Sequence, residues 1–452
     1  MSKINIKSFI SIITSKIVLK LSKTLFKGGS NFPGKIALKI DKNILKTITK
    51  NYKIIIVTGT NGKTTTTSMI YNILKKSGKN VITNNTGANM LPGVVACFVD
   101  NFSFNTPSKN KFAVIEVDEA NVKFITKHVK PEIITITNLF RDQLDRYGEV
   151  YTTLNKILEG IKLTPTSKLV LNGDESLLGD LDIKNPLVYY GFGTSPTNTN
   201  KIGVNADAKF CKKCKAPYKY NFVTYNHLGD YYCDQCGYKR PNLKYTMNKI
   251  IDLTESCSTV LINKKEFSIN QPGTYNIYNA LCAYSICKEF DINDSIMRES
   301  LGNQKSSFGR QETINIEGKN IKIILVKNPA GYDEAINTIT LNKKIIDMTF
   351  LLNDNYADGR DVSWIWDVNF EKLTSLNIGN IIISGVRLYD MAIRLKIAEL
   401  DESKFNLCEN YERVVDQIKS SNSETTYVLT TYTAMLEFRK FLYSKGYIEN
   451  LW

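Results

Sequence analysis

The chain has 452 residues, enough for about three domains of ordinary size. Hydrophobic residues make up 42% of it and charged residues 23%, a composition that is typical of globular proteins and excludes bulk disorder. The formal net charge of +15 suits an anionic partner, which can be a nucleotide, a nucleic acid or a membrane surface.

Residues 1–50 are predicted to form a basic amphipathic helical segment. Its apolar residues lie between Phe9 and Leu21, and Lys16 and Lys20 interrupt them well short of the ~20 apolar residues that a membrane-spanning helix needs. Lysines, rather than the small residues of a signal-peptide cleavage site, follow this stretch. We expect the helix to pack on the domain that follows it, and the alternative is contact with a membrane surface.

A hydrophobic strand over residues 54–57 is predicted to lead into a phosphate-binding loop, and a helical pattern follows the loop. Glycines let backbone N–H groups approach phosphate oxygens, and the N-terminus of the following helix adds a favourable dipole. Lys63 would reach the terminal phosphates of a nucleotide, and the Thr64 hydroxyl would help to hold Mg²⁺. The predicted ATP-binding residues are Gly59, Thr60, Asn61, Gly62, Lys63, Thr64 and Thr65.

Further hydrophobic runs alternate with helical patterns and end in polar residues. Runs over 112–115 and 133–137 end at Glu116 and Asn138. This alternation predicts a parallel sheet that is covered on both faces and binds its ligand at the carboxyl ends of the strands. A Glu116 carboxylate beside Thr64 would complete an oxygen-rich Mg²⁺ shell, and its alternative role is that of a solvated acid at a strand end.

Residues from about 203 to 242 interrupt the α/β pattern and are predicted to be an insertion. They carry two CxxC pairs, Cys211 with Cys214 and Cys233 with Cys236, separated by 18 residues. Two tight pairs at this spacing are typical of a zinc ribbon with tetrahedral thiolate ligands. Four ligands leave no open position, so we expect a structural Zn²⁺; the alternative is reduced, unligated cysteines. The odd total of nine cysteines argues against a fully paired secreted framework and favours a reducing cytoplasm.

A second α/β unit is predicted to begin near Arg310. Strand-like runs over 321–326, 348–352, 381–384 and 427–430 alternate there with helical patterns. The expected organisation is therefore the N-terminal segment 1–50, a central ATPase domain over 51–310 that contains the insertion, and a smaller Rossmann-like α/β domain over 311–452.

The form of the phosphate loop resembles the Mur ligase superfamily, which includes the folylpolyglutamate synthases. Val57 stands where the usual phosphate loop has its first glycine. Glu116 matches the magnesium-binding glutamate of the superfamily. Thr137-Asn138 together with residues 142–145 resembles its Asn…Asp-His-x-Asp stretch, with Gln143 in place of the histidine.

Two further segments extend this resemblance. Residues 273–280 resemble the nucleotide-contacting stretch of the superfamily, which implies that Asn276 and Asn279 contact ATP. The segment 309–312 resembles its linker, and Arg310 matches the linker arginine. A cation on a mobile second domain can neutralise charge on a transferred phosphoryl group, and the alternative for Arg310 is an ordinary surface arginine.

The kind of ligase is indicated by what surrounds the loop. The 58 residues before Gly59 are too few for a nucleotide-sugar domain, so a UDP-muramyl substrate is not expected. The zinc insertion and the segments 327–331 and 353–361 closely resemble the MurT family, the synthetase subunits of lipid II isoglutaminyl synthases. The resemblance implies that ATP phosphorylates the α-carboxylate of D-glutamate in the lipid II stem peptide, and that ammonia then displaces phosphate to leave D-isoglutamine.

The source of ammonia is indicated by the histidines, which are His128 and His227, the second of them inside the insertion. A self-contained Cys–His glutaminase is hard to build from these two, so a separate subunit is the simpler arrangement. The resemblance implies a GatD-like glutaminase partner, whose Cys–His pair would be completed by Asp361. The alternative for Asp361 is a turn or helix-capping aspartate.

Two other functions remain as alternatives. The first is another Mur-type amide ligase, such as a folylpolyglutamate synthase, and the zinc insertion and the Asp358–Asp361 segment argue against it. The second is a zinc-ribbon ATPase that binds nucleic acid, which the basic charge suggests. A helicase-like motif or a basic stretch interleaved with aromatics is not apparent, so a nucleic-acid partner is not expected. The expected location is the cytoplasm, at the inner face of the membrane if the N-terminal helix touches it.

Overall fold

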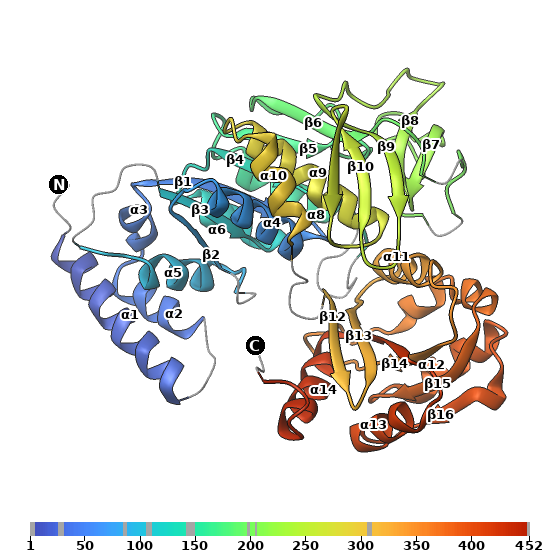
Figure 1. Cartoon of the computed structure of the whole chain (residues 1–452). Coiled ribbons are helices and arrows are strands. Elements are labelled where there is room, and N and C mark those ends of the chain that lie inside the picture. The colour runs from blue at the N-terminus through green and yellow to red at the C-terminus, as the bar shows by residue number, and fades with distance from the viewer. Residues whose placement is uncertain are drawn as a thin grey trace.

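The computed structural model describes residues 5–25, 31–84, 88–104, 111–141, 150–196, 199–203, 206–304 and 310–449. These residues form two α/β units, each built around a large sheet. The central unit runs from blue to yellow in Figure 1 and the C-terminal unit from orange to red. The predicted α/β class is confirmed.

The central sheet is mostly parallel, with its strands in the order β11-β10-β9-β6-β5-β4-β1-β3-β2. Neighbours from β2 to β9 along this order pair in parallel, whereas β10 is antiparallel to β9 and β11. The predicted parallel sheet is confirmed, and the antiparallel strands extend it beyond the predicted runs. The strands are β1 (Tyr52–Thr58), β2 (Val81–Thr83), β3 (Lys111–Glu116), β4 (Ile133–Ile136), β5 (Lys168–Asn172), β6 (Leu187–Phe192), β9 (Tyr245–Leu253), β10 (Ser258–Ile262) and β11 (Lys265–Ile269).

Helices cover both faces of this sheet, as its hydrophobic strands require. Ile55 and Val57 of β1 pack with α4 and α9, while Ile54 and Ile56 pack on the opposite face with α5, α6 and α8. The helices of the unit are α4 (Lys63–Lys76), α5 (Leu91–Asp100), η1 (Glu119–Asn121), α6 (Val122–Thr126), α8 (Val150–Ile161), α9 (Thr274–Lys288) and α10 (Asp294–Gly302).

The order of the central strands places a ligand site beside β1. This strand pairs with β3 on one side and with β4 on the other, so the chain leaves its carboxyl end at a point where the strand order reverses. Crevices at such points are where open α/β sheets bind ligands. The predicted phosphate loop directly follows β1.

The N-terminal segment folds as α1 (Ile6–Leu25), α2 (Phe32–Ile40) and α3 (Ile44–Ile48). Helix α1 lies at the outer edge of the molecule, where it packs on α2 and α5 (Figure 1). Within the described residues, no helix has the length and apolar character that crossing a bilayer requires.

The predicted insertion contains an antiparallel hairpin of β7 (Lys219–Tyr225) and β8 (Leu228–Tyr232). Short antiparallel bridges, Phe210 with Pro217 and Tyr232 with Lys239, close the turns that carry the two cysteine pairs. A small cluster of tyrosines packs around these turns, so the insertion has a core of its own.

The C-terminal sheet has the order β12-β13-β17-β14-β15-β16 and is parallel except for β12, which is antiparallel to β13. Four predicted runs correspond to β13, β14, β15 and β17, while β12 and β16 were not predicted. The strands are β12 (Arg310–Ile316), β13 (Lys319–Leu325), β14 (Ile346–Leu351), β15 (Ile378–Ser384), β16 (Phe405–Leu407) and β17 (Thr425–Thr430). The helices are α11 (Pro329–Ile339), η2 (Ser363–Asp367), η3 (Phe370–Ser375), α12 (Leu388–Ile397), η4 (Glu402–Lys404), α13 (Tyr411–Ser420) and α14 (Tyr432–Ser444).

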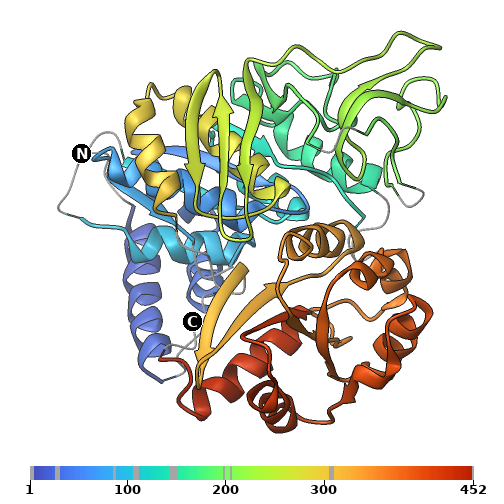
Figure 2. The ribbon, with the colours of Figure 1, turned by 45° about the vertical axis from the view of Figure 1, so that its right-hand side comes forward.

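Helix α11 lies on the side of the C-terminal unit that faces the central unit, as Figures 1 and 2 both show. It begins within the segment 327–331, which the sequence singled out. The cap residue of α11, Asn328, contacts Asn61 of the phosphate loop.

Candidate active site

The loop after β1 depends on two glycines in left-handed backbone conformations. Gly59 has φ +117° and Gly62 has φ +82°, and Gly62 is the residue from which α4 starts. A Cβ atom on Gly59 would lie 2.5 Å from the Thr137 hydroxyl oxygen, and one on Gly62 would lie 2.1 Å from the Asn279 side-chain oxygen. Both the backbone conformation and the lack of space exclude a side chain at these two glycines. The loop therefore presents only backbone atoms where a phosphate would approach it.

The segment that follows β4 holds this loop in place. The backbone N–H of Asn61 donates to the Asn138 side-chain oxygen at 2.9 Å, and the N–H of Thr60 donates to the Asn138 carbonyl at 3.0 Å. The Thr137 hydroxyl donates to the Asn61 carbonyl at 2.7 Å. The Thr137-Asn138 segment, which the sequence singled out by its resemblance, therefore fixes the conformation of the loop.

Lys63 lies at the N-terminus of α4 with its ammonium group almost buried. It donates to the carbonyl oxygens of Gly59 at 2.5 Å and Thr60 at 3.1 Å, and to the Glu119 carboxylate at 3.0 Å. Burial raises the pKa of Glu119 above its ordinary value, although the charges of Lys63 and Lys327 act in the opposite direction. Lys63 is therefore held at the phosphate loop by groups that the sequence did not assign to it.

The Thr64 hydroxyl and the Glu116 carboxylate meet beside the loop. The hydroxyl donates to Glu116 Oε2 at 2.8 Å, and the Asn89 side-chain amide donates to Glu116 Oε1 at 3.1 Å. Asn84 fixes the backbone of Glu116 from both sides, because it donates to the Glu116 carbonyl at 2.8 Å and accepts from its N–H at 2.9 Å. A hydroxyl and a carboxylate that converge next to a phosphate loop form the oxygen donor set that suits Mg²⁺. The pair fits the predicted metal.

Asn276 and Asn279 lie on the first turns of α9, against the loop. The Asn279 amide donates to the Asn276 side-chain oxygen at 3.1 Å, and the Thr66 hydroxyl donates to Asn279 at 3.2 Å. Both asparagines line a cavity of about 70 Å³ together with Gly62 and Thr65. The structure thus brings the predicted nucleotide-contacting residues together with the phosphate loop.

The C-terminal unit closes one side of this cavity. Asn61 and Asn328 exchange two side-chain hydrogen bonds, of 3.3 and 3.0 Å. Asn328 also caps α11 by accepting from the Gly331 N–H at 2.8 Å. Lys327, the residue before the cap, lines the same cavity. The sequence could not have paired Asn61 with Asn328, because 267 positions separate them.

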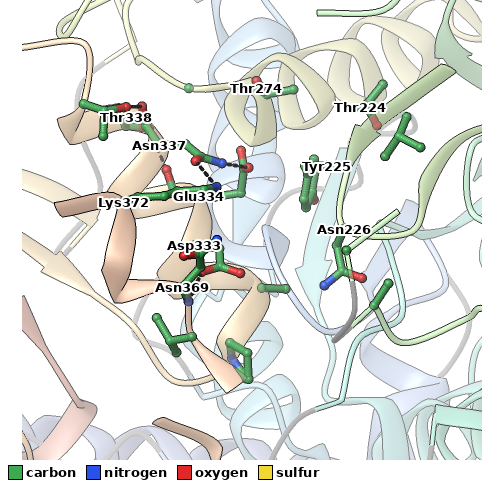
Figure 3. Close-up of a pocket in the computed structure, with 18 of the residues that line it drawn as sticks. Thr224, Tyr225, Asn226, Thr274, Asp333, Glu334, Asn337, Thr338, Asn369 and Lys372 are labelled. Atoms are coloured by element: carbon green, nitrogen blue, oxygen red, sulfur yellow. Dashed lines mark hydrogen bonds between the residues drawn. The ribbon is translucent and has the colours of Figure 1, made fainter. Parts of the chain in front are cut away.

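A larger cavity of about 780 Å³ adjoins the first and lies between the ribbon hairpin and α11 (Figure 3). Tyr225, Ala330 and Glu334 line both cavities. Figure 3 shows Glu334 and Asn337 of α11 facing Tyr225 of β7. Asn337 donates to Glu334 at 2.8 Å, and burial raises the pKa of Glu334 to about 7. No sequence pattern indicates this acid, because its pKa depends on what packs around it.

The four predicted zinc ligands come together at the base of the ribbon. Their sulfur atoms all lie within 4.8 Å of one another, with Cys211 and Cys236 3.5 Å apart and Cys214 and Cys233 3.4 Å apart. Zn–S bonds of about 2.3 Å in a tetrahedron require S···S distances of about 3.8 Å. The cluster therefore fits a tetrahedral Zn²⁺ with four thiolate ligands.

The ribbon is joined to the segment after β4 by a buried pair. His227, in the turn between β7 and β8, lies 2.9 Å from the Glu175 carboxylate, and the same carboxylate oxygen accepts from the Leu139 N–H at 3.1 Å. Burial lowers the pKa of His227, but the carboxylates of Glu175 and Asp207 together raise it, and the net shift is upward. Leu139 directly follows Asn138, and the ribbon turn is thus linked to the phosphate loop.

Asp361 lies apart from the phosphate loop, in a depression of about 320 Å³ on the C-terminal unit. Its carboxylate accepts from the Ser363 N–H at 2.8 Å, and Arg360, Arg387 and Asp390 line the same depression. Trp366 lines both this depression and the 780 Å³ cavity, so the two adjoin.

The structure does not describe every residue of the predicted site. Residues 142–145, with Gln143, and Gly309 lie outside the described residues. Arg310 is described by its backbone, as the first residue of β12. The role expected of its side chain stays a prediction.

The chain matches two family models. Residues 57–232 match the Mur ligase middle domain, and residues 325–435 match the MurT ligase C-terminal domain. Among solved structures, a pseudomurein peptide ligase type C from Methanothermus fervidus aligns over 90% of this chain and 81% of its own, with a TM-score of 0.67 and 22% identity. A folylpolyglutamate synthase from Thermotoga maritima aligns over 97% and 99%, with a TM-score of 0.59 and 16% identity. These likenesses show the Mur ligase fold.

Two curated relatives are similar along most of their length. The MurT subunit of the glutamine-hydrolysing lipid II isoglutaminyl synthase of Streptococcus pneumoniae is 42% identical over 93% of this chain and 94% of that protein. The corresponding subunit of Staphylococcus aureus is 35% identical over 87% and 89%. Together with the match to the MurT C-terminal model, this similarity shows that the chain belongs to the MurT family of Mur-type ligases.

Proposed function

We propose that this chain is the ATP-dependent synthetase subunit of a lipid II isoglutaminyl synthase. It phosphorylates the α-carboxylate of D-glutamate in the lipid II stem peptide, and ammonia then displaces phosphate to leave D-isoglutamine. The observation that carries the proposal is a complete phosphate loop, with Thr64 against Glu116, in a chain that is 42% identical to a MurT subunit along 93% of its length.

The chemistry explains why a nucleotide is needed. A carboxylate is a poor electrophile, and its oxide is a poor leaving group. A carboxylate oxygen attacks the γ-phosphorus of ATP and ADP leaves, which gives an acyl phosphate. The nitrogen of ammonia then attacks the acyl carbon, the C–O bond to phosphate breaks, and the nitrogen loses a proton to leave the amide.

The residues around the loop have distinct roles in this proposal. The backbone from Gly59 to Thr65 and the Lys63 ammonium bind the β- and γ-phosphates. Thr64 and Glu116 would hold Mg²⁺, which when bound neutralises charge on those phosphates. Asn276 and Asn279 contact the nucleotide, and Arg310 neutralises charge on the transferred group. Support for the roles of the residues other than Arg310 comes from the arrangement of the described side chains beside the loop.

A glutaminase subunit of the GatD type is the proposed source of ammonia. An exposed apolar surface on the C-terminal unit supports a partner at Asp361. It consists of Val386, Tyr389, Ile393 and Ile397, which are 55% to 65% exposed, and we name it the α12 patch. Arg387 and Asp390 lie next to patch residues in the sequence and line the Asp361 depression. Apolar surface of this extent beside a charged depression is typical of a protein interface.

In this arrangement the Asp361 carboxylate orients the imidazole of the partner's Cys–His pair and stabilises its protonated form. Trp366 lines both the Asp361 depression and the 780 Å³ cavity, and this cavity continues to Ala330 beside the phosphate loop. The cavity therefore offers ammonia a route from Asp361 to the phosphate loop. The cysteine cluster is proposed to hold a structural Zn²⁺.

The test is a reconstitution. The purified chain is mixed with a GatD-type glutaminase, ATP, Mg²⁺, glutamine and lipid II, and the stem peptide is analysed by mass spectrometry. We expect one carboxylate to become an amide, in reactions that contain both subunits. Activity with a folate and glutamate, or ATP hydrolysis driven by a polynucleotide, in place of amidation would contradict the proposal.

A further inference from the structure

Helix α1 is amphipathic in the opposite sense to an ordinary surface helix. Its buried face carries three serines and one large apolar residue, Ile12, and this face packs closely against α2 and its flanking residues. Ser8 donates to Asp41 at 2.6 Å, Ser11 to the Ala37 carbonyl at 2.9 Å and Ser15 to the Pro33 carbonyl at 2.8 Å. A helix that packs on a domain usually buries its large apolar side chains instead.

Six large apolar side chains of α1 lie on its outer face, whereas Ile12 is buried. They recur every three or four residues, are 37% to 79% exposed, and form what we name the α1 stripe: Ile6, Phe9, Ile10, Ile13, Ile17 and Leu21. The ring of Phe9 also contacts that of Phe104, which is itself exposed, with the centroids 5.3 Å apart. Helix α1 itself lies at the outer edge of the molecule (Figure 1). Contiguous apolar surface of this kind marks an interaction site.

The charges of α1 indicate what the stripe contacts. Residues 6–25 contain lysines and no acidic residue. Lys7 and Lys20 are exposed at opposite ends of the stripe. A second copy of the chain, paired antiparallel through this stripe, would bring lysines against lysines. An anionic surface with an apolar layer beneath it would match both the charges and the stripe.

We propose that α1 lies flat in the interface of an anionic lipid bilayer, with the α1 stripe in the acyl-chain boundary and its lysines among the headgroups. A 20-residue helix is about 30 Å long, so the stripe would contact the bilayer along its whole length. The proposal goes beyond the proposed function and stands independently of it, because binding to vesicles requires neither ATP nor an acceptor.

The test uses the full chain and vesicle flotation. Vesicles of phosphatidylcholine alone are compared with vesicles that also contain phosphatidylglycerol. We expect the unaltered chain to float with the anionic vesicles, and we expect Ile10→Gln/Ile13→Gln/Ile17→Gln to weaken its partition coefficient by about tenfold or more. These three side chains are exposed, so the triple variant should keep the thermal unfolding curve of the parent chain.

A matched control removes three equally exposed aliphatic side chains that form no stripe. Leu163→Gln/Ile251→Gln/Ile345→Gln changes residues that are 46% to 54% exposed in separate parts of the chain, and we expect it to bind vesicles like the parent chain. Lys7→Gln/Lys20→Gln should weaken binding to the anionic vesicles, and added salt should weaken the binding of the parent chain in the same way.

The proposal is overturned if the parent chain does not float with anionic vesicles, or if the stripe variant floats as well as the parent. It is also overturned if the parent chain is a dimer that the stripe variant breaks and neither binds vesicles. In that case a second copy of the chain covers the stripe.

Discussion

Glu334 is a buried carboxyl in the wall of the large cavity, and burial raises its pKa from 4.5 to about 7. Between these two values the folded chain holds a proton that the unfolded chain has released. The stability contributed by this group therefore falls as the pH rises through that window, and the loss is complete above about pH 7.

The variant Glu334→Gln keeps an oxygen to accept from Asn337 and removes the ionisation. We expect its free energy of unfolding to exceed that of the parent chain by up to about 3 kcal/mol at about pH 8 and to match it near pH 4. Denaturant unfolding at both pH values measures the difference. Glu266→Gln, at an exposed glutamate, serves as the control and should change neither value. An equal effect at both pH values would contradict the assigned ionisation.

Asp361 has a proposed role in glutamine hydrolysis by the partner and none in the ATP-dependent amidation that follows. We expect Asp361→Asn to lower glutamine-dependent amidation by about 100-fold or more, because the partner's imidazole loses the carboxylate that orients it. Amidation from ammonium salts should persist, since Asp361 lies apart from the phosphate loop. Asp390→Asn removes a carboxylate from the same depression and should retain coupling to glutamine. Equal loss of both activities in Asp361→Asn would refute the role.

Individual site residues were predictable where one motif holds them. The loop glycines, Lys63 and Thr64 follow the spacing of a phosphate loop, and Glu116 was singled out as the acid at the end of a later strand. The structure places these residues together. Glu119 was visible as an acid after a strand, but its contact with Lys63 was not assigned. Asn328 could not be found from spacing, because its contact with Asn61 depends on how two sheets pack.

At the scale of elements, the ribbon that carries the four-cysteine cluster connects to the phosphate loop through His227, Glu175 and Leu139. We expect Cys233→Ser to lose the bound Zn²⁺, because the thiolate of this buried residue completes the tetrahedral set. Loss of the metal should also weaken ATP binding by several-fold, since the ribbon turn supports the segment after β4.

Metal content by mass spectrometry of the native chain and titration with a fluorescent nucleotide check both effects. Cys257→Ser, at a cysteine outside the cluster, should keep the zinc and the nucleotide affinity of the parent chain. A chain that retains zinc without Cys233, or binds ATP equally well without zinc, would contradict this coupling.

Elements with a strong local pattern were predictable, and those defined by their partners were not. The strands β1, β3 and β4 carry continuous hydrophobic runs that are buried on both faces. The strand β9 exposes residues along much of its length, and β16 has three residues, so neither carries a hydrophobic run. The inverted amphipathicity of α1 was also hidden, because the sequence does not tell which face packs inward.

At the scale of the whole molecule, the two units meet at several separate places. Asn61 bonds with Asn328 at the phosphate loop. Farther away, Glu255 of the central unit accepts from Lys322 at 3.1 Å, Asn342 at 2.8 Å and Tyr427 at 2.8 Å of the C-terminal unit. These contacts hold the C-terminal unit over the cavity beside the phosphate loop. A phosphoryl transfer that is shielded from water requires such an arrangement.

The central claim is that the chain itself makes an acyl phosphate from ATP and a cell-wall acceptor. The most direct measurement mixes the isolated chain with ATP, Mg²⁺, lipid II and ammonium chloride, without a glutaminase, and follows ADP and amide together. We expect ADP to form in the presence of lipid II, in equal amount to the amide, and both products to be lost in Lys63→Met. ADP that forms at the same rate without lipid II, or that forms with no amide, would contradict the account.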